Sequence, residues 1–161
     1  LWENQNLPWV DSILFFIYTG FRISEMLSLR TANVDLKEWT MRGGVKTEAG
    51  KNRLVPVHSK IQGIVQKRFE QSKVGYLFEY EGKEVSESKY REIWADLMDK
   101  LKMKHTPHEC RHTFRSRLDS AGANKVCIDR LMGHKSKGTG ERVYTHKNIE
   151  ELRTNIELIT N

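Results

Sequence analysis

The sequence predicts a mixed α+β fold that is mostly α-helical, with a small three-stranded antiparallel sheet near its N-terminal side. Apolar residues recur at helical spacing along most of the chain, and the period becomes strand-like only between residues 34 and 58. The chain has 161 residues, the size of one ordinary domain. A single core built mainly from helices is therefore expected.

Two helices are predicted at the start of the chain. Helical spacing in the first involves Val10, Ile13, Leu14, Ile17 and Tyr18. Residues 7–9 would supply a proline-started first turn, and Thr19-Gly20 would end the helix. A second, short helix is expected over residues 23–29, with Met26, Leu27 and Leu29 on its buried face.

Short strands and then further helices are expected in the rest of the chain. The predicted strands are residues 34–36, 39–41 and 52–58, and Pro56 places the last of them at a sheet edge or strand end. The predicted helices cover residues 61–69, 86–101, 107–120, 125–132 and 148–159. The last helix carries one apolar stripe, formed by Ile149, Leu152, Ile156 and Ile159.

The composition favours a protein that binds a polyanion. Lys and Arg number 27 against 21 Asp and Glu, a formal net charge of +6, and nucleic acid is the simplest partner for such an excess. Cys110 and Cys127 are too few for a disulfide-stapled secreted scaffold, so a reducing compartment is expected. No apolar run approaches the roughly 20 residues that span a bilayer, so we expect no membrane partner.

Residues 108–112 match the H-E-x-x-H zinc pattern of metallopeptidases. On a helix His108 and His112 would share a face, and Glu109 would serve as the base. Pro107 argues against this interpretation because it places His108 in the first helical turn. Arg111 would add a fixed cation beside the metal, and only Glu141 and Asp129 offer a third ligand.

Five motifs occur in a fixed order along nearly the whole chain. They are T-G-F-R-I-S-E-M-L at residues 19–27, V-K-T at 45–47 followed by R-L-V-P at 53–56, P-H-E-C-R-H-T-F at 107–114, L-M-G-H-K-S at 131–136, and Y-T-H at 144–146. This ordered set resembles the catalytic domain of the tyrosine recombinases, the phage integrase family. The resemblance implies the tyrosine recombinase catalytic-domain fold.

The resemblance also implies the main catalytic groups. Tyr144 would attack a DNA phosphate and form a 3′-phosphotyrosyl bond, and its phenol needs a base or a cationic field because its reference pKa is about 10. Arg22 and Arg111, both expected at helix starts, would bind the phosphate oxygens, which a planar guanidinium matches. His108 and His134 would hydrogen-bond the phosphate and move protons.

The remaining implied roles belong to a lysine and to supporting residues. Lys46 would protonate the leaving 5′ oxygen, with Lys51 as the alternative if the hairpin register differs. Glu25 and Glu109 would orient an arginine or histidine, with His112 among the supporting residues. The chain has Glu109, Cys110 and Arg115 where the family usually has Asp, Leu and a small residue. Candidate phosphate contacts are Arg30, Arg42, Lys51, Arg53, Arg91, Lys104, Arg117, Lys135 and Lys137.

The resemblance therefore predicts an enzyme that cuts and rejoins DNA in site-specific recombination, in a phage or mobile element. No cofactor, metal or ATP is expected, because the phosphotyrosyl bond conserves the phosphodiester energy. The expected partners are double-stranded DNA and further copies of the chain, as a dimer or tetramer on paired sites, in the cytoplasm of a bacterial or phage-infected cell. The alternatives are type IB topoisomerase-like relaxation, a non-catalytic DNA-binding module and the zinc peptidase.

The expected domain organisation has two parts. Residues 1–147 form the catalytic domain, and residues 148–161 form a C-terminal docking helix of the same domain. The resemblance implies an upstream core-binding domain that is absent from this chain. The apolar stripe of the last helix would either close the domain's own core or insert into a neighbouring protomer. Our hypothesis is that the tail couples protomers and is loosely held in the free domain.

Overall fold

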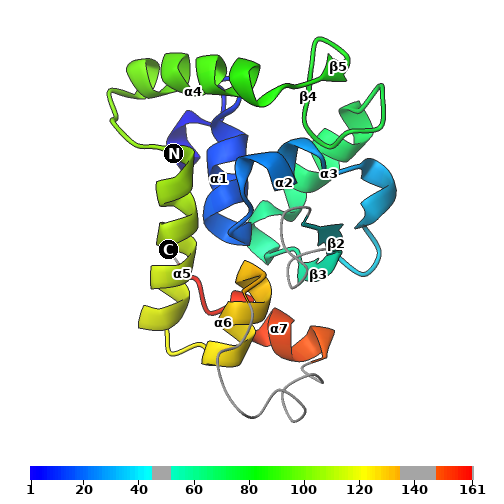
Figure 1. Ribbon diagram of the computed structural model, residues 1–161, viewed down its shortest axis with the longest axis vertical. Helices are drawn as coiled ribbons and strands as arrows, with labels where there is room; N and C mark the ends of the chain where they lie inside the picture. Colours follow the sequence, from blue (N-terminus) through cyan, green and yellow to red (C-terminus); the bar gives the residue numbers. More distant parts are fainter. Residues whose placement is uncertain (45–51, 135–147, 161) are drawn as a thin grey trace.

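The computed structural model describes residues 1–44, 52–134 and 148–160. It confirms the mixed, mostly helical class. The α-helices are α1 (Val10–Thr19), α2 (Ile23–Leu27), α3 (Gln62–Gln71), α4 (Glu87–Leu101), α5 (Pro107–Ser120), α6 (Lys125–Met132) and α7 (Ile149–Ile156). The described residues also include 3-10 turns at Trp2–Asn4, Thr31–Asn33 and Ser59–Ile61. Helix α1 lies in the middle of the molecule and packs along α5, while α4 crosses one end (Figure 1).

The predicted three-stranded sheet is present and antiparallel. Its strands are β1 (Val34–Asp35), β2 (Thr40–Gly43) and β3 (Arg53–Pro56), in the order β1-β2-β3. Met41 is paired with Val34 on one side and Val55 on the other. Strand β3 is an edge strand in this order, as Pro56 predicts. Helices α6 and α7 both pack against β3, so the sheet is joined directly to the C-terminal helices.

The first helix begins later than predicted. Trp9 has φ 70°, a left-handed conformation that cannot continue an α-helix, so α1 begins at Val10 and Pro8 lies before it. Packing holds Trp9 in this conformation: its ring lies against Phe78 and Tyr90. The prediction of a proline-started first turn at residues 7–9 is therefore wrong, because the tertiary contacts of Trp9 override the local signal.

A second hairpin lies where the sequence predicts no element. Strands β4 (Glu79–Tyr80) and β5 (Lys83–Glu84) pair across Glu81 and Gly82, whose φ angles are 53° and 69°. Positive φ at both central residues is typical of a type I′ turn. The strands are two residues long, too short for an alternating pattern to mark them in the sequence.

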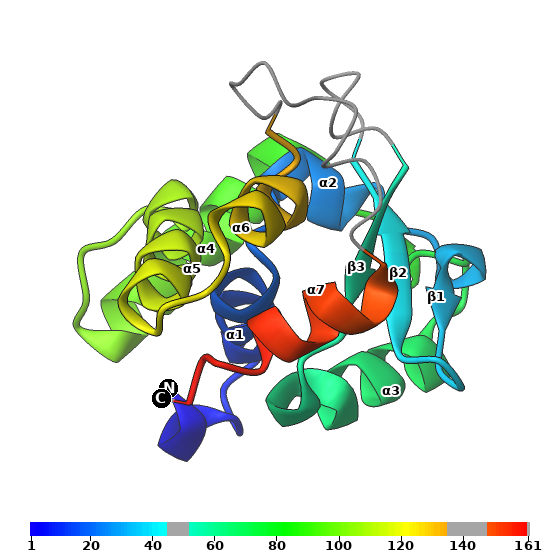
Figure 2. The same cartoon turned by 90° about the horizontal axis from the view of Figure 1, so that it is seen from below.

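Helix α7 closes the core of its own chain. Leu152, Ile156 and Ile159 are buried, and α7 lies between α6 and β3 (Figure 2). The end of the tail is also anchored: the His58 Nε2–H donates to the Ile159 carbonyl at 2.9 Å, while His58 Nδ1 accepts the Lys60 amide at 3.0 Å. Of the two alternatives for the apolar stripe, this structure has the one in which the stripe packs against the chain's own core, and how tightly the tail is held stays a prediction.

Candidate active site

The link between α1 and α2 places Arg22 at the edge of a cleft. Gly20 ends α1 with φ 65°, and a side chain there would collide with the Phe114 ring. Both the backbone conformation and the lack of space therefore require glycine at this position. Arg22 is extended and forms the N-cap of α2, as expected for a residue at a helix start. Its side chain is 25% exposed, so the guanidinium is reachable from solution.

Glu25 is a buried carboxylate that Arg22 shares with two other arginines. It is 1% exposed. Its Oε1 accepts from the Arg22 guanidinium at 3.0 Å, and its Oε2 accepts the Arg22 amide at 2.8 Å. Burial alone raises the pKa of Glu25, but the hydrogen bonds and charge of Arg53, with smaller contributions from Arg22 and Arg111, bring it below the usual value. Glu25 therefore binds both the backbone amide and the guanidinium of Arg22, and its supporting role in the reaction stays a prediction.

Arg111 is buried in the second turn of α5, not at the helix start. Its guanidinium donates to the carbonyls of Gly20 and Met132, and Nη1 lies 3.8 Å from Glu25 Oε2. Burial and the positive charge of Arg22 lower the pKa of Arg111 to about 10, so the group stays protonated at neutral pH. A buried guanidinium that two backbone carbonyls hold is fixed before any ligand arrives.

His134 follows α6 directly. Gly133 ends that helix with φ 64°, which turns the chain so that His134 Nε2 lies 3.3 Å from Arg111 Nη2. Burial and the positive charge of Arg111 lower the pKa of His134, although Asp129 opposes them. Because Arg111 can only donate, Nε2 is the acceptor, and the neutral ring carries its proton on Nδ1, 3.9 Å from Asp129.

His108 lies in the first turn of α5, beside His112. Their ring centroids are 4.7 Å apart and nearly perpendicular. Burial, His112 and Arg111 together lower the pKa of His108, which favours the neutral ring. Glu109 does not contact this pair: it accepts the Thr106 amide at the helix start and lies 3.8 Å from His105.

The described residues provide no third ligand for the zinc site that the H-E-x-x-H pattern predicts. His108 and His112 do share a helix face, but Glu109 is used as the cap of its own helix. Within residues 1–44, 52–134 and 148–160, no group of three His, Cys, Asp or Glu side chains lies close enough to hold a metal ion. Asp129 contacts His134 instead of the H-E-x-x-H pair.

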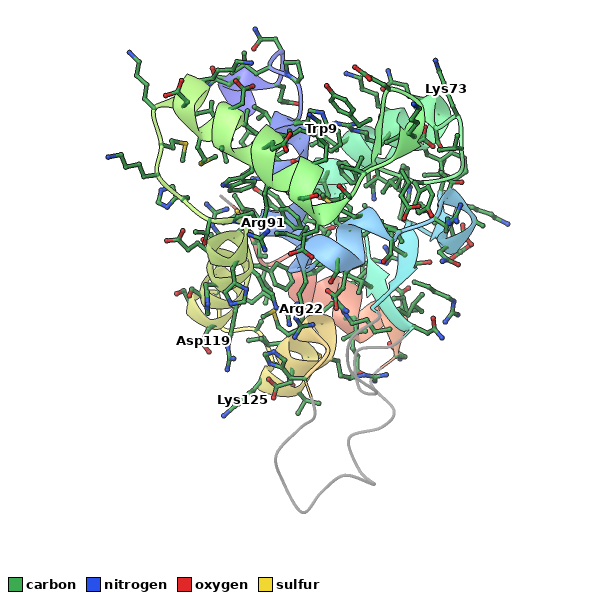
Figure 3. The ribbon with its side chains drawn as sticks, turned by 45° about the horizontal axis from the view of Figure 1, so that its top comes forward. Trp9, Arg22, Lys73, Arg91, Asp119 and Lys125 are labelled. Carbon is green, nitrogen blue, oxygen red and sulfur yellow. The ribbon has the colours of Figure 1, made fainter. Side chains whose placement is uncertain are left out.

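Arg22, His108 and Arg111 line one cleft of about 390 Å³. Its other wall comes from the start of α4, with Glu87 and Arg91. Figure 3 labels Arg22 and Arg91, which lie on the two sides of this cleft. Four cationic or imidazole groups line this one opening, Arg22, Arg91, His108 and Arg111, and they form a site suited to a phosphate, since each can donate a hydrogen bond to an oxygen.

Six residues singled out from the sequence lie outside the described residues: Lys46, Lys51, Lys135, Lys137, Glu141 and Tyr144. Gly44 and Asn52, the described residues on either side of Lys46 and Lys51, are joined by a backbone hydrogen bond of 3.4 Å. The roles of Lys46, Lys51 and Tyr144 stay predictions.

Arg53 belongs to the interior of the site, which the sequence does not predict. It is predicted as a surface phosphate contact, but it is 8% exposed and its guanidinium is bonded to Glu25 and to the Leu131 carbonyl. The strand pattern holds the missed signal, because Arg53 alternates with Leu54 and so shares a face with Val55 and Val57, both fully buried.

The sequence of residues 5–151 matches the phage integrase family. The chain is 30% identical over 152 residues to tyrosine recombinase XerC of Thermodesulfovibrio yellowstonii, covering 85% of this chain and 49% of that protein. The chain therefore belongs to the phage integrase family. It spans about half the length of the curated relatives that it matches.

Solved structures of integrases have the same fold. The Tn1549 transposon integrase, solved in complex with circular intermediate DNA, superposes with a TM-score of 0.68 at 25% identity, covering 91% of this chain and 56% of that one. The integrase from mycobacterium phage Brujita superposes with a TM-score of 0.72 at 22% identity, covering 92% and 50%. In the part of the chain that the structure describes, no helix is both long and apolar enough to cross a bilayer.

Proposed function

We propose that this chain is the catalytic domain of a site-specific recombinase or integrase, which cuts and rejoins DNA strands through a 3′-phosphotyrosyl intermediate. One observation carries the proposal: the buried carboxylate of Glu25 holds Arg22 and lies beside Arg111, and both arginines line the cleft that also contains His108. Two fixed guanidiniums match the charge that builds on the non-bridging oxygens when phosphorus is attacked.

The reaction follows from these groups. The Tyr144 oxygen attacks phosphorus and passes its proton to a neutral histidine, His108 or His134, while the tyrosyl O–P bond forms and the P–O5′ bond breaks. The released 5′ oxygen takes a proton from Lys46 or Lys51. Rejoining is the reverse, with a 5′-hydroxyl attacking the phosphotyrosine. The pKa values of His134 and His108 are both lowered, mainly by burial, which favours their neutral rings, and we assign to them hydrogen bonds to the phosphate and proton transfer.

We extend the proposal to partners. Double-stranded DNA is the substrate, a role supported by the basic charge and by the Tn1549 integrase, which was solved with DNA. Further copies of the chain would assemble as a dimer or tetramer on paired sites, with an upstream core-binding domain gripping the opposite side of the duplex. The setting would be the cytoplasm of a bacterial or phage-infected cell.

The test is capture of the covalent intermediate. A nicked duplex that loses its 5′-terminal fragment on cleavage should trap the chain as an adduct on a denaturing gel. Tyr144→Phe keeps the ring but removes the attacking oxygen, so we expect no adduct and nearly unchanged duplex binding. A normal adduct yield from the Phe variant would disprove the assignment of the nucleophile, and no adduct from the unaltered chain would disprove the function.

A further inference from the structure

The guanidinium of Arg53 is buried and bonded in three directions. Nη1 and Nη2 donate to the two oxygens of Glu25, at 2.8 and 2.9 Å, and Nε donates to the Leu131 carbonyl at 3.0 Å. Its flat face covers the Phe21 ring at 4.7 Å. This is the two-pronged geometry that fixes a carboxylate in both position and rotation.

Fixing Glu25 also fixes Arg22. The oxygen that accepts from Arg53 Nη1 is the same Oε1 that accepts from the Arg22 guanidinium. Arg22 is partly exposed and has a flexible side chain, and Glu25 is its one carboxylate partner within the described residues. If Glu25 rotated, Arg22 would lose its orientation toward the cleft.

The third hydrogen bond of Arg53 connects it to the end of α6, which is followed by His134. Leu131 is in the last turn of α6, where backbone carbonyls have no partner within the helix. Arg53 binds the Leu131 carbonyl and Arg111 binds that of Met132, so two guanidiniums hold consecutive carbonyls just before Gly133 and His134. Cations are favoured at this end of a helix, which carries partial negative charge.

We propose that Arg53 is a positioning residue of the reaction, which orients Arg22 through Glu25 and His134 through the Leu131 carbonyl. It does not line the cleft and acts only through these neighbours. The inference rests on the proposed function, because its consequence is a change in the rate of DNA cleavage.

The experiment measures the single-turnover rate of adduct formation on the nicked duplex at saturating protein. Duplex affinity and stability to urea are measured beside it. Arg53→Met should slow adduct formation by about 100-fold, the loss typical of catalytic groups misplaced by an ångström, with duplex affinity little changed. Arg53→Lys keeps the charge, but an ammonium group cannot bond both Glu25 oxygens and the Leu131 carbonyl in one plane. We therefore expect Arg53→Lys to recover the stability to urea but not the rate of adduct formation.

Arg68→Met is the matched control. Arg68 also makes a two-pronged pair, with Asp11 at 2.6 and 2.7 Å, and covers the Trp9 ring at 4.7 Å. Trp9 is well separated from Arg22 in Figure 3. We expect Arg68→Met to lose stability and to keep the cleavage rate.

The outcomes separate the two proposals. Failure of the unaltered chain to form an adduct overturns both. If the unaltered chain forms the adduct and Arg53→Met is as fast as Arg68→Met, the positioning role alone is overturned. If Arg53→Met does not fold, Arg53→Lys decides: a rate equal to that of the unaltered chain overturns the role, and a slow rate with a folded protein supports it.

Discussion

At the scale of the residue, Glu25 organises the charges of the site. It is 1% exposed and has almost no contact with water, so its negative charge is compensated by Arg53, Arg22 and Arg111. A carboxylate in this position is needed for the fold as well as the chemistry, since three buried or half-buried cations depend on it.

Glu25→Gln should lower the free energy of unfolding at pH 7 by about 3–5 kcal/mol, the range for breaking a buried ion pair. The pKa of Glu25 is lowered by folding, so the unfolded chain takes up the proton first as the pH falls. The stabilisation is therefore complete above about pH 4.3, the pKa of an unperturbed Glu, and is lost as the pH falls through the folded value.

Urea unfolding of both proteins between pH 3 and pH 7 checks this prediction. The gap between them should narrow in acid, where the native carboxyl also becomes neutral. Glu92→Gln is the control, because Glu92 makes an exposed ion pair with Lys89 and its loss should matter by less than about 1 kcal/mol. A gap that stays constant with pH would contradict the prediction.

At the scale of the element, the site is built from helix ends. Gly20 and Gly133 each end a helix in the left-handed conformation, and the carbonyls of Gly20 and Met132 both accept from Arg111. At each of these helix ends the glycine changes the direction of the chain, and a carbonyl at that end accepts a hydrogen bond from the Arg111 guanidinium.

Gly20→Ala should destabilise the fold by more than about 1 kcal/mol, because φ of 65° is strained for alanine and the new Cβ meets the Phe114 ring. Gly63→Ala on α3 is the opposite case, with nothing near the added Cβ, and should be stabilising by about 0.4–1 kcal/mol. Thermal unfolding of the two variants should therefore shift in opposite directions. Equal shifts would count against the strained turn.

Helix α7 offers a second test at this scale. Ile156→Ala removes a fully buried side chain and should lower the free energy of unfolding by about 2–5 kcal/mol. Leu158→Ala, two residues along and 37% exposed, should change it by less than about 0.5 kcal/mol. Urea titrations measure both. If Ile156→Ala were as mild as Leu158→Ala, the tail would not be part of this core.

At the scale of the whole molecule, the local patterns in the sequence predict most of the fold. Helices α5 and α6 have the predicted bounds because Pro107, Gly122 and Gly133 mark them within a few residues. Arg22 and Glu25 are three residues apart on one helix, so their pairing is also a local property. Helix bounds and ion pairs that depend on residues close together in the sequence can therefore be predicted from it.

The rest depends on partners that are distant in the sequence. Arg53 and Glu25 are 28 residues apart, and no local pattern says that their side chains meet. The left-handed Trp9 likewise depends on Phe78 and Tyr90, which belong to later segments. Such features depend on how the elements pack together. The spacing of residues along one element does not predict this packing.

The three arginines around a single carboxylate have a consequence for the whole molecule. Arg22, Arg53 and Arg111 place three positive charges around the single negative charge of Glu25, and burial followed by the charge of Arg22 lowers the pKa of Arg111. An anion in the cleft would add a second negative charge beside these three cations. Binding and folding become thermodynamically linked, and an oxyanion should act as a stabiliser of the fold.

Inorganic phosphate should therefore raise the melting temperature in a saturable way, beyond the effect of sodium chloride at the same ionic strength. Arg22→Gln should weaken this response, since Arg22 is the partly exposed member of the three. Thermal unfolding monitored by fluorescence, with and without each salt, measures it. With DNA as the proposed substrate, a backbone phosphate in the cleft would offset the excess positive charge of these arginines, and its binding would add to the stability of the fold.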